Sequence, residues 1–486
     1  MPATQPELGT DPLPIIWKGE EEYEEARVGR VFNLRRPKRY PVGVLEARNV
    51  SDVIRGVNLA RERGIQVALR SGGHSWAAWS VRPQSLLIDL GKMRELSYDP
   101  VTKIATASPA ITGGELNPLL SRYGRFFAGG HCPTVGIGGF LLQGGQGWWA
   151  RGLGWSAENI ESIDVVLPSG ELVTASEKDN ADLFWAARGS GPGFFGVVVR
   201  FRLHTRPRPL DMHHVTYIMP AKENFRAVIT WLQEACRGEL GPKVEVVCLA
   251  FTRGRLFGET GPNELESMLV IRGTSNTDSE EEAREALAPM LKCPGAANAE
   301  VRAEIVPTSM PEEYARQLAD NPPGQYFLGN SWLVGEPADI ADSLELGFTT
   351  LPSRESFFLY YNMAPLRPLP DMSFTLQSEH YAAGYIISTG DDVPEQERCE
   401  QWLTDRLAYI DSKKDGSGGT IGMYLGDSDL AHRAGKIMSD EAWAKFCKIR
   451  DAYDPNHMFA GYLHGDSLLN VEAWNQPNYK PYKAPA

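Results

Sequence analysis

The stretch Phe126–Gly147 reads FFAGGHCPTVGIGGFLLQGGQG and contains eight glycines, most of them in pairs. Glycine is used where a backbone must approach another group closely or adopt a positive φ. A single turn needs one or two such residues, so this run predicts a backbone moulded around a large flat or phosphorylated ligand. Cys132 lies inside the run and is followed by Pro133.

A second stretch upstream, Val67–Trp76, reads VALRSGGHSW and has the same character. An apolar strand leads into Arg70 and two glycines, and His74 follows them. Glycine-rich loops on their own are more often turns, and a lone cysteine is more often a small buried hydrophobe. The two stretches favour a cofactor site because they occur together.

Together these stretches resemble the flavin-binding domain of the vanillyl-alcohol-oxidase superfamily, and more closely that of the berberine-bridge-enzyme-like oxidases. The shared motifs are R-S-G-G-H, ending at His74, and the C-P-x-V-G-x-G-G loop, beginning at Cys132. The resemblance covers most of residues 42–204. It implies FAD bonded covalently to both His74 and Cys132.

The resemblance also implies how the rest of the FAD is held. Arg70 and the amides of residues 71–75 would face the pyrophosphate, because unpaired N–H groups in such a loop form an anion-binding concavity. Val135 would border the space where oxygen reaches the flavin, which favours an oxidase. The expected cofactor-binding residues are His74, Cys132, Arg70, Ser71, Gly72, Gly73, Ser75, Val135, Gly136, Gly138, Gly139, Gly145, Gly147, Val197 and Tyr462.

The pattern of elements predicts an α+β fold in three segments. Residues 1–208, with a core at 40–205, read as a βαβ-like FAD-binding part, and Arg206–Pro209 reads as a linker. Residues 209–430 alternate strand-like and helix-like runs, which are compatible with a parallel sheet. The resemblance implies instead a substrate domain with an antiparallel sheet covered by helices.

The C-terminal segment, residues 431–486, carries a D-P-x-x-x-F signature from Asp454 to Phe459. A helix is expected to stop before its proline. In the resembling enzymes this segment returns to the flavin domain. We therefore expect a two-part FAD-binding domain of the vanillyl-alcohol-oxidase type, formed by both chain ends.

The catalytic residues are less clearly marked. A flavin takes a hydride from a carbon bearing OH or NH, and the protein must help to remove the heteroatom proton. The family's Tyr-x-Asn base element is matched only by Tyr424-Leu-Gly, which keeps the tyrosine and loses the asparagine. His380 and His464 are alternative bases, since histidine titrates near neutrality. Tyr361 is a candidate donor to a substrate oxygen, and for each residue a purely structural role stays open.

Composition excludes several classes of protein. The chain has 486 residues, enough for two or three domains, and a net charge of −13 without a basic cluster, so a nucleic-acid partner is not expected. No apolar run is long enough to span a membrane, and the N-terminus lacks the features of a secretory signal. Six dispersed cysteines without metal-ligand spacing predict no metal site and a reduced, intracellular, cytoplasmic protein.

The sequence thus predicts an FAD-dependent oxidoreductase with bicovalently attached flavin. It would transfer a hydride from an alcohol, sugar or secondary-metabolite carbon to FAD, and molecular oxygen would reoxidise the flavin to give hydrogen peroxide. Its expected partners are a small-molecule substrate and oxygen, and it would act as a monomer or homodimer. Two alternatives stay open: an oxygen-avoiding dehydrogenase of the same fold, and a non-catalytic flavin-binding relative.

Overall fold

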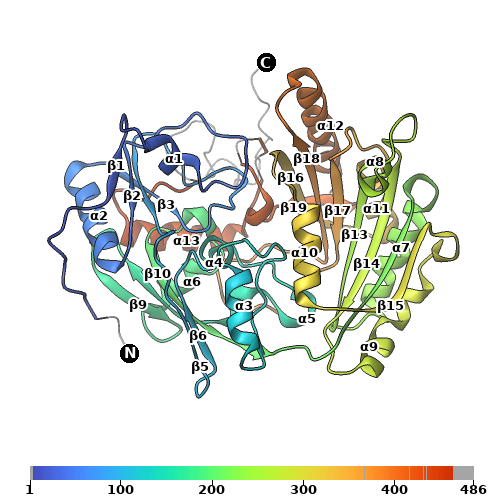
Figure 1. Ribbon diagram of the computed structural model, residues 1–486, viewed down its shortest axis with the longest axis horizontal. Helices are drawn as coiled ribbons and strands as arrows, with labels where there is room; N and C mark the ends of the chain where they lie inside the picture. The colour runs from blue at the N-terminus through green and yellow to red at the C-terminus, as the bar shows by residue number, and fades with distance from the viewer. Residues whose placement is uncertain (1–3, 366, 415, 431, 434, 463–486) are drawn as a thin grey trace.

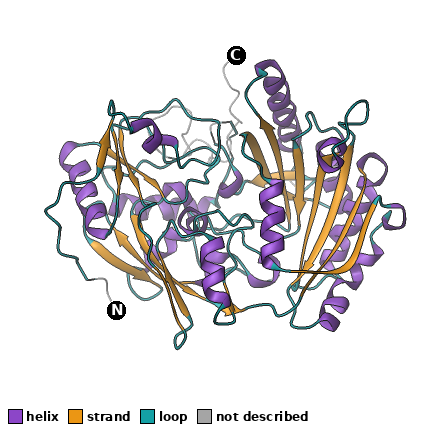
Figure 2. Ribbon diagram, viewed as in Figure 1, coloured by secondary structure: helices purple, strands orange, loops and turns teal. Residues whose placement is uncertain are grey.

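The computed structural model describes residues 4–365, 367–414, 416–430, 432–433 and 435–462. Two halves lie side by side, and the chain crosses from one to the other and back (Figure 1). The first half contains two small sheets and a further pair of short strands, and the second is built on one large sheet with helices on its outer side (Figure 2).

The first small sheet is mostly parallel. Its strand order is β1-β2-β4-β3, with β2, β4 and β3 parallel and β1 antiparallel to β2. Helix α2 connects β2 to β3. It is capped at its N-terminus by Asn49, whose side chain accepts a hydrogen bond from the Asp52 N–H, and it ends at Gly64, which has a φ of 62°. The elements are β1 (Ile15–Trp17), α1 (Tyr23–Val28), β2 (Gly43–Glu46), α2 (Val50–Arg63), β3 (Gln66–Arg70) and β4 (Ser85–Asp89).

The second small sheet is antiparallel, in the order β5-β6-β10-β8-β9. Helix α3 begins with a capping box between Thr112 and Glu115, which offsets the presence of Pro118 inside the helix. The elements are β5 (Leu96–Asp99), β6 (Ile104–Ala107), α3 (Gly113–Ser121), β7 (Arg125–Phe126), α4 (Ile137–Leu142), α5 (Ala150–Leu153), η1 (Ser156–Asn159), β8 (Ile160–Val166), β9 (Leu172–Ser176), α6 (Ala181–Ala187), η2 (Gly191–Gly193), β10 (Val197–His204) and β11 (Arg206–Pro207).

The large sheet has eight strands in the order β15-β12-β14-β13-β17-β18-β16-β19, and every neighbouring pair is antiparallel. This confirms the antiparallel arrangement. Its elements are β12 (Met212–Pro220), α7 (Ala221–Arg237), β13 (Val244–Thr252), α8 (Arg253–Phe257), β14 (Ser267–Ser275), α9 (Glu280–Leu287), η3 (Ala288–Lys292), η4 (Ala296–Asn298), β15 (Val301–Thr308), α10 (Met310–Asp320), β16 (Gln325–Val334), α11 (Pro337–Thr349), β17 (Phe357–Tyr361), β18 (His380–Ser388), α12 (Val393–Ser412), β19 (Gly419–Gly422) and η5 (Leu425–Asp427).

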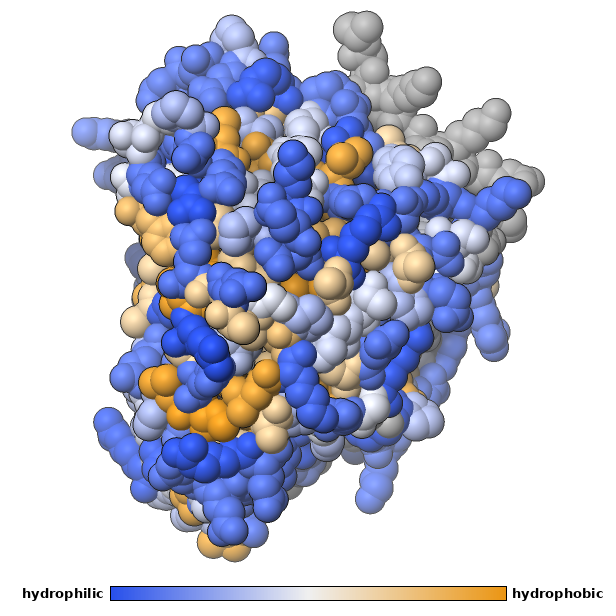
Figure 3. Space-filling model, turned by 90° about the vertical axis from the view of Figure 1, so that its right-hand side faces the viewer, coloured by the Kyte–Doolittle hydropathy of each residue, from blue (hydrophilic) through white to orange (hydrophobic). Residues whose placement is uncertain are grey.

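Both faces of the large sheet are covered, and β13 shows why. Side chains alternate along a strand, so Val246 and Cys248 pack under helices such as α7 and α11, while Val247 and Leu249 point to the opposite face. That opposite face is turned toward the first half of the molecule. The outer, helix-covered side is mostly hydrophilic at its surface, with apolar side chains gathered in a limited area (Figure 3).

The last described residues return to the first sheet. Helix α13 (Asp440–Tyr453) packs beside α6, and the buried Asp454 then accepts the N–H groups of Met458 and Phe459 at 2.8 and 2.9 Å. Phe459 pairs in parallel with Val67 of β3. The expected domain built from N-terminal and C-terminal segments of the chain is confirmed. The boundaries 1–208, 209–430 and 431–486 remain our proposal.

Within the described ranges, no helix combines the length and apolar character needed to cross a membrane.

We predict that Asp454→Ala destabilises the C-terminal return. The free energy of unfolding should fall by roughly 3 kcal/mol. Each hydrogen bond to a charged acceptor contributes about 1.5–3 kcal/mol, and the substitution removes the acceptor of two buried N–H groups. The measurement is urea unfolding followed by tryptophan fluorescence. The matched control is Asp451→Ala, an exposed aspartate on α13; an equal effect of the two variants would contradict this role of Asp454.

Candidate functional site

A cavity lies between the glycine loops of the first half and the inward face of the large sheet. Its empty space is about 2040 Å³, counting the part open to solvent. On one side it is lined by residues of the stretches 69–76, 130–139 and 191–198, although not by every residue of the last two, together with Phe459 and Ala460 of the returning chain. On the other side are β13, β17 and β18, and the end of α10 lies at its edge.

The two glycine loops touch through their backbones. A Cβ added to Gly72 would lie 2.7 Å from the nitrogen of Gly136, and a Cβ added to Gly136 would lie 2.7 Å from the Cα of Gly72. Gly73 has φ 81°, and a Cβ there would lie 1.8 Å from the carbonyl oxygen of Arg30. No side chain fits at these three positions, so the glycines are required for the two loops to pack against each other.

This packing brings His74 and Cys132 to one place on the cavity wall. The His74 Nε2 lies 2.8 Å from the Thr134 hydroxyl, and the Cys132 sulfur lies 3.3 Å from the same hydroxyl. The Phe32 ring stacks on the imidazole with a centroid distance of 4.3 Å. Burial lowers the pKa of His74 to about 4, so its imidazole is neutral near pH 7. A neutral imidazole has a nitrogen lone pair available for bond formation.

The loop before His74 fits an anionic group. Within the described residues, the backbone N–H groups of Gly72, Gly73, His74 and Ser75 donate no hydrogen bond to the protein. These residues line the cavity, so the unpaired N–H groups form the kind of concavity that holds phosphate oxygens. The residues present therefore fit the pyrophosphate of FAD.

Arg70 is placed differently from the expectation. Its guanidinium is buried and bonds to Asp89 and to the carbonyl oxygens of Ala26 and Arg27. These partners already use its donors, so Arg70 holds α1 to β3 and β4 and does not present a free cation to the cavity.

The other expected cofactor-binding residues divide into two groups. Those that line the cavity are Ser71, Gly72, Gly73, Ser75, Val135, Gly136, Gly138 and Gly139. Those that do not line it are Gly145, Gly147, Val197 and Tyr462. The Tyr462 ring lies directly under Gly193, and its buried hydroxyl has no hydrogen-bond partner within the described ranges.

Two of the four catalytic candidates line the cavity, a third lies on the other face of the sheet, and the fourth falls outside the described residues. Tyr424 and Tyr361 line the cavity, and burial raises the pKa of both phenols, which therefore stay protonated. His380 begins β18 but faces the helix side, where its Nδ1 lies 2.7 Å from the Tyr360 hydroxyl and burial lowers its pKa to about 4. His464 lies outside the described residues.

Two polar groups of the cavity were missed from the sequence. Asp427 ends η5 and lines the cavity, only three residues after Tyr424. His131 precedes Cys132, and its Nε2 lies 2.9 Å from the carboxylate of Glu245 on β13. Their positions beside Tyr424 and Cys132 were the available signal, although neither belongs to the motifs that carry the resemblance.

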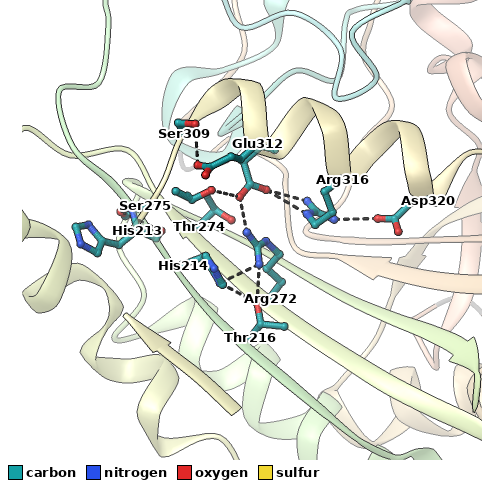
Figure 4. Close-up of polar contacts among 12 residues, drawn as sticks. His213, His214, Thr216, Arg272, Thr274, Ser275, Ser309, Glu312, Arg316 and Asp320 are labelled. Atoms are coloured by element: carbon teal, nitrogen blue, oxygen red, sulfur yellow. Dashed lines mark hydrogen bonds and ion pairs between the residues drawn. The ribbon is translucent and has the colours of Figure 1, made fainter. Parts of the chain in front are cut away.

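Helix α10 adds a charged edge to the cavity. Arg316 and Asp320 project from it toward the cavity side and form an ion pair at 2.9 Å (Figure 4). The helix is held to the sheet by Glu313, which is buried and ion-paired with Arg272 of β14. Burial acts to raise the pKa of Glu313, but Arg272 and Arg316 together bring it below its usual value. The position of the cavity edge thus depends on a buried ion pair.

Comparison with known proteins identifies the family. A family model described as "FAD binding domain" matches residues 41–176. The FAD-linked oxidoreductase janO of Penicillium janthinellum is 34% identical over 94% of this chain and 99% of its own length.

Two solved structures show the same fold. The BBE-like 1 protein of Physcomitrella patens has a TM-score of 0.76 at 17% identity, covering 94% of this chain and 97% of its own. The xylooligosaccharide oxidase of Myceliophthora thermophila, solved with xylobiose, has a TM-score of 0.75 at 23% identity, covering 92% and 95%.

The fold, the paired glycine loops and the full-length similarity define a flavoprotein oxidoreductase. The chain belongs to the FAD-linked oxidoreductases and contains their FAD binding domain, and its fold is that of the BBE-like 1 protein.

We predict that Glu313→Gln loosens α10. Removing one partner of a buried ion pair costs about 3–5 kcal/mol, because Arg272 keeps an uncompensated buried charge. The folded-state pKa of Glu313 is lowered, so its contribution is present above the ordinary value of 4.5 and is lost as the pH falls through the folded pKa. Urea unfolding should therefore show a difference from wild type that narrows below pH 4.5.

The control for this prediction is Glu312→Gln, the exposed neighbour whose carboxylate accepts a hydrogen bond from the Ser309 hydroxyl. A difference between wild type and Glu313→Gln that is constant with pH would contradict the assignment.

Proposed function

We propose that this enzyme carries FAD bonded covalently to both His74 and Cys132 and oxidises a carbon bearing OH or NH on a small molecule, with oxygen as the final acceptor. The observation that carries this proposal is the convergence of His74 and Cys132 on the single hydroxyl of Thr134. These two side chains are 58 positions apart in the sequence, and they meet at a point where a single flavin ring could be bonded to both.

When bound, FAD supplies the hydride acceptor and passes the electrons to oxygen. The N–H groups of residues 72–75 would hold the pyrophosphate. His74 and Cys132 would fix the ring at their end of the cavity, and the substrate would bind in the remaining space beside the sheet. Tyr361 and Tyr424, being protonated, are donors to substrate oxygen or nitrogen atoms.

The wall opposite the glycine loops is apolar where it belongs to β13 and β17. It presents Val247, Leu249, Phe357 and Leu359. A sugar would need several hydrogen-bonding partners on this wall, because its hydroxyls lose their water on binding. The wall favours an alcohol or amine on a largely apolar molecule, and we place a sugar second.

The double attachment predicts a specific pattern of masses. Under denaturing conditions the wild-type polypeptide should carry the mass of FAD. Each of His74→Ala and Cys132→Ala should keep it through the other bond, and the double variant should lose it. The measurement is intact-mass spectrometry, and Cys447→Ala, another partly buried cysteine, is the control. A wild-type chain at the bare polypeptide mass would overturn the proposal.

The type of reaction is tested with a panel of substrates. Purified enzyme is assayed for hydrogen peroxide with benzyl alcohol, cinnamyl alcohol, 4-hydroxybenzyl alcohol and xylobiose. Peroxide formation supports the oxidase. Flavin bleaching without peroxide under air indicates the dehydrogenase, and flavin that cannot be reduced, even by dithionite, indicates a non-catalytic relative.

Val135 lines the cavity beside Gly130, where a Cβ would lie 3.4 Å from the Val135 Cβ. We predict that Val135→Leu slows reoxidation by oxygen about tenfold, which is ~1.4 kcal/mol in the barrier, because the larger side chain narrows the space for oxygen. Stopped-flow mixing of dithionite-reduced enzyme with oxygenated buffer measures this step directly. Val198→Leu, on the cavity wall formed by β10, is the control, and equal slowing in both variants would argue against a specific role for Val135.

A further inference from the structure

The base element of this family is incomplete here, so the proton acceptor has to be sought among the groups in the cavity. Tyr361 and Tyr424 are protonated phenols, and the Tyr424 oxygen already accepts the N–H of Gln146 at 3.1 Å. His74 is assigned to the flavin. Among the described residues that line the cavity, the carboxylates are Asp320 and Asp427, and His131 is the remaining imidazole.

Asp427 is held deep in the cavity by donors from two sides. The Tyr381 hydroxyl, on β18, donates to its Oδ2 at 2.9 Å, and the indole N–H of Trp76 donates to its Oδ1 at 3.3 Å. Tyr385, also on β18, hydrogen-bonds to the same carboxylate. A carboxylate can accept about four hydrogen bonds. Three donors therefore leave capacity for one more, from a ligand in the cavity.

The turn that carries Asp427 is rigid. The side-chain amide of Asn330, on β16, donates to the carbonyl oxygens of Tyr424 at 2.9 Å and Asp427 at 2.6 Å. The Tyr424 N–H donates back to the Asn330 oxygen at 2.8 Å. Asn330 is fully buried. A reacting group must be held in place to this degree for efficient proton transfer.

Asp427 also lies close to the proposed flavin attachment. Trp76 is two residues beyond His74 in the same loop, and its ring packs at 5.5 Å from Phe32, which stacks on His74. The carboxylate thus faces the cavity from the side of the sheet. Its hydrogen bond with the indole of Trp76 links it to the loop that carries His74. A substrate between ring and sheet would contact it.

We propose that Asp427 is the general base of this enzyme, accepting the proton of the substrate OH or NH, and that Tyr381 and Tyr385 are positioning residues for it. The inference rests on the proposed function. In the step, the substrate C–H bond breaks with its electron pair, which leaves as hydride to the bound flavin. The O–H or N–H bond breaks and its proton goes to the Asp427 carboxylate, while a C=O or C=N bond forms.

The electrostatics of the site suit this role. Burial raises the pKa of Asp427 above its usual value, and the hydrogen bonds from Tyr381, Trp76 and Tyr385 moderate the shift. A carboxylate with a raised pKa holds a proton more firmly than an ordinary aspartate, which strengthens it as a base near neutral pH. The titratable groups that face it are His131 and the four tyrosines Tyr361, Tyr381, Tyr385 and Tyr424.

His131 is the competing base. Its Nε2 pairs with Glu245, which also accepts the Trp149 N–H at 2.6 Å, so the imidazole is held in one orientation. It belongs to the same loop as Cys132, and its ring also packs 5.9 Å from that of Tyr361 on β17. The contact with Glu245 occupies its Nε2, whereas the Asp427 carboxylate keeps one acceptor position for a ligand in the cavity, and this difference favours Asp427.

The first experiment compares holoenzymes that carry Asp427→Asn, Asp320→Asn and His131→Gln. Their intact mass and visible spectrum are recorded to show that flavin is attached. Anaerobic bleaching by cinnamyl alcohol and benzyl alcohol is then followed from pH 5 to 9. We expect Asp427→Asn to slow bleaching by about 100-fold or more and to abolish the rise of the rate with pH, as loss of a general base does. Asp320→Asn should keep the wild-type profile. A normal profile in Asp427→Asn, or loss of the pH dependence only in His131→Gln, would overturn the proposal.

A second measurement needs no substrate. Sulfite, an anion that binds reversibly at the flavin ring and bleaches it, is titrated at pH 8. Removing a nearby negative charge should tighten its binding in Asp427→Asn by about tenfold and leave it unchanged in Asp320→Asn. Unchanged sulfite binding in Asp427→Asn would place the carboxylate away from the ring and overturn the proposal even if neither alcohol reacts. Absence of attached flavin in the wild type would instead refute the proposed function.

Tyr381→Phe separates positioning from a structural role. Its hydrogen bond lowers the pKa of Asp427, so its loss should move the midpoint of the rate profile to higher pH while leaving the attached flavin in place. The control is Tyr360→Phe, on the opposite face of the sheet, where the hydroxyl meets His380. An unshifted midpoint in Tyr381→Phe would overturn the role assigned to this tyrosine.

Discussion

The backbone contact between the two glycine loops is the constraint on which the site depends. Gly72 and Gly136 approach so closely that neither tolerates a Cβ, and this approach carries the flanking His74 and Cys132 to the same hydroxyl of Thr134. The geometry at this end of the cavity is therefore set by main chain. Backbone held by two packed loops is more rigid than long side chains, which suits a site that must orient a large cofactor.

The large sheet completes the site by using both of its faces. Helices cover one face, and the other forms a wall of the cavity, so strands such as β13 are apolar almost throughout. Most of that wall is hydrocarbon, and its polar groups are concentrated around η5 and β18. In a cavity of this kind a small number of hydrogen bonds fixes the orientation of the substrate. Contacts with the apolar wall add affinity, but they are not directional and do not orient the substrate. The chemistry is then decided by which polar group meets the reacting atom.

Much of the fold was predictable because its signals are local. The glycine loops and the D-P-x-x-x-F signature are contiguous motifs, and the mixed fold with an antiparallel sheet covered by helices follows from the resemblance that they carry. Other elements have weak local signals. Strand β16 contains Gly329-Asn330, which reads as a turn, and its place between β18 and β19 comes only from the sheet. Helix α10 is short, and its main anchor is the ion pair of Glu313 with Arg272, 41 positions away.

The sequence by itself determined the class of protein, because glycines, a histidine and a cysteine in fixed order specify a loop geometry that few other functions need. It did not determine what the remaining polar residues do. The sequence indicated Arg70 as a phosphate ligand, but its guanidinium is hydrogen-bonded to Asp89 and to backbone carbonyls of α1. It indicated His380 as a base, but that side chain faces the helices. Asp427 carried no motif and yet lies among the donors of the cavity. Only the tertiary structure decides such cases, since the partner and the face of a side chain are set by residues far away in the chain.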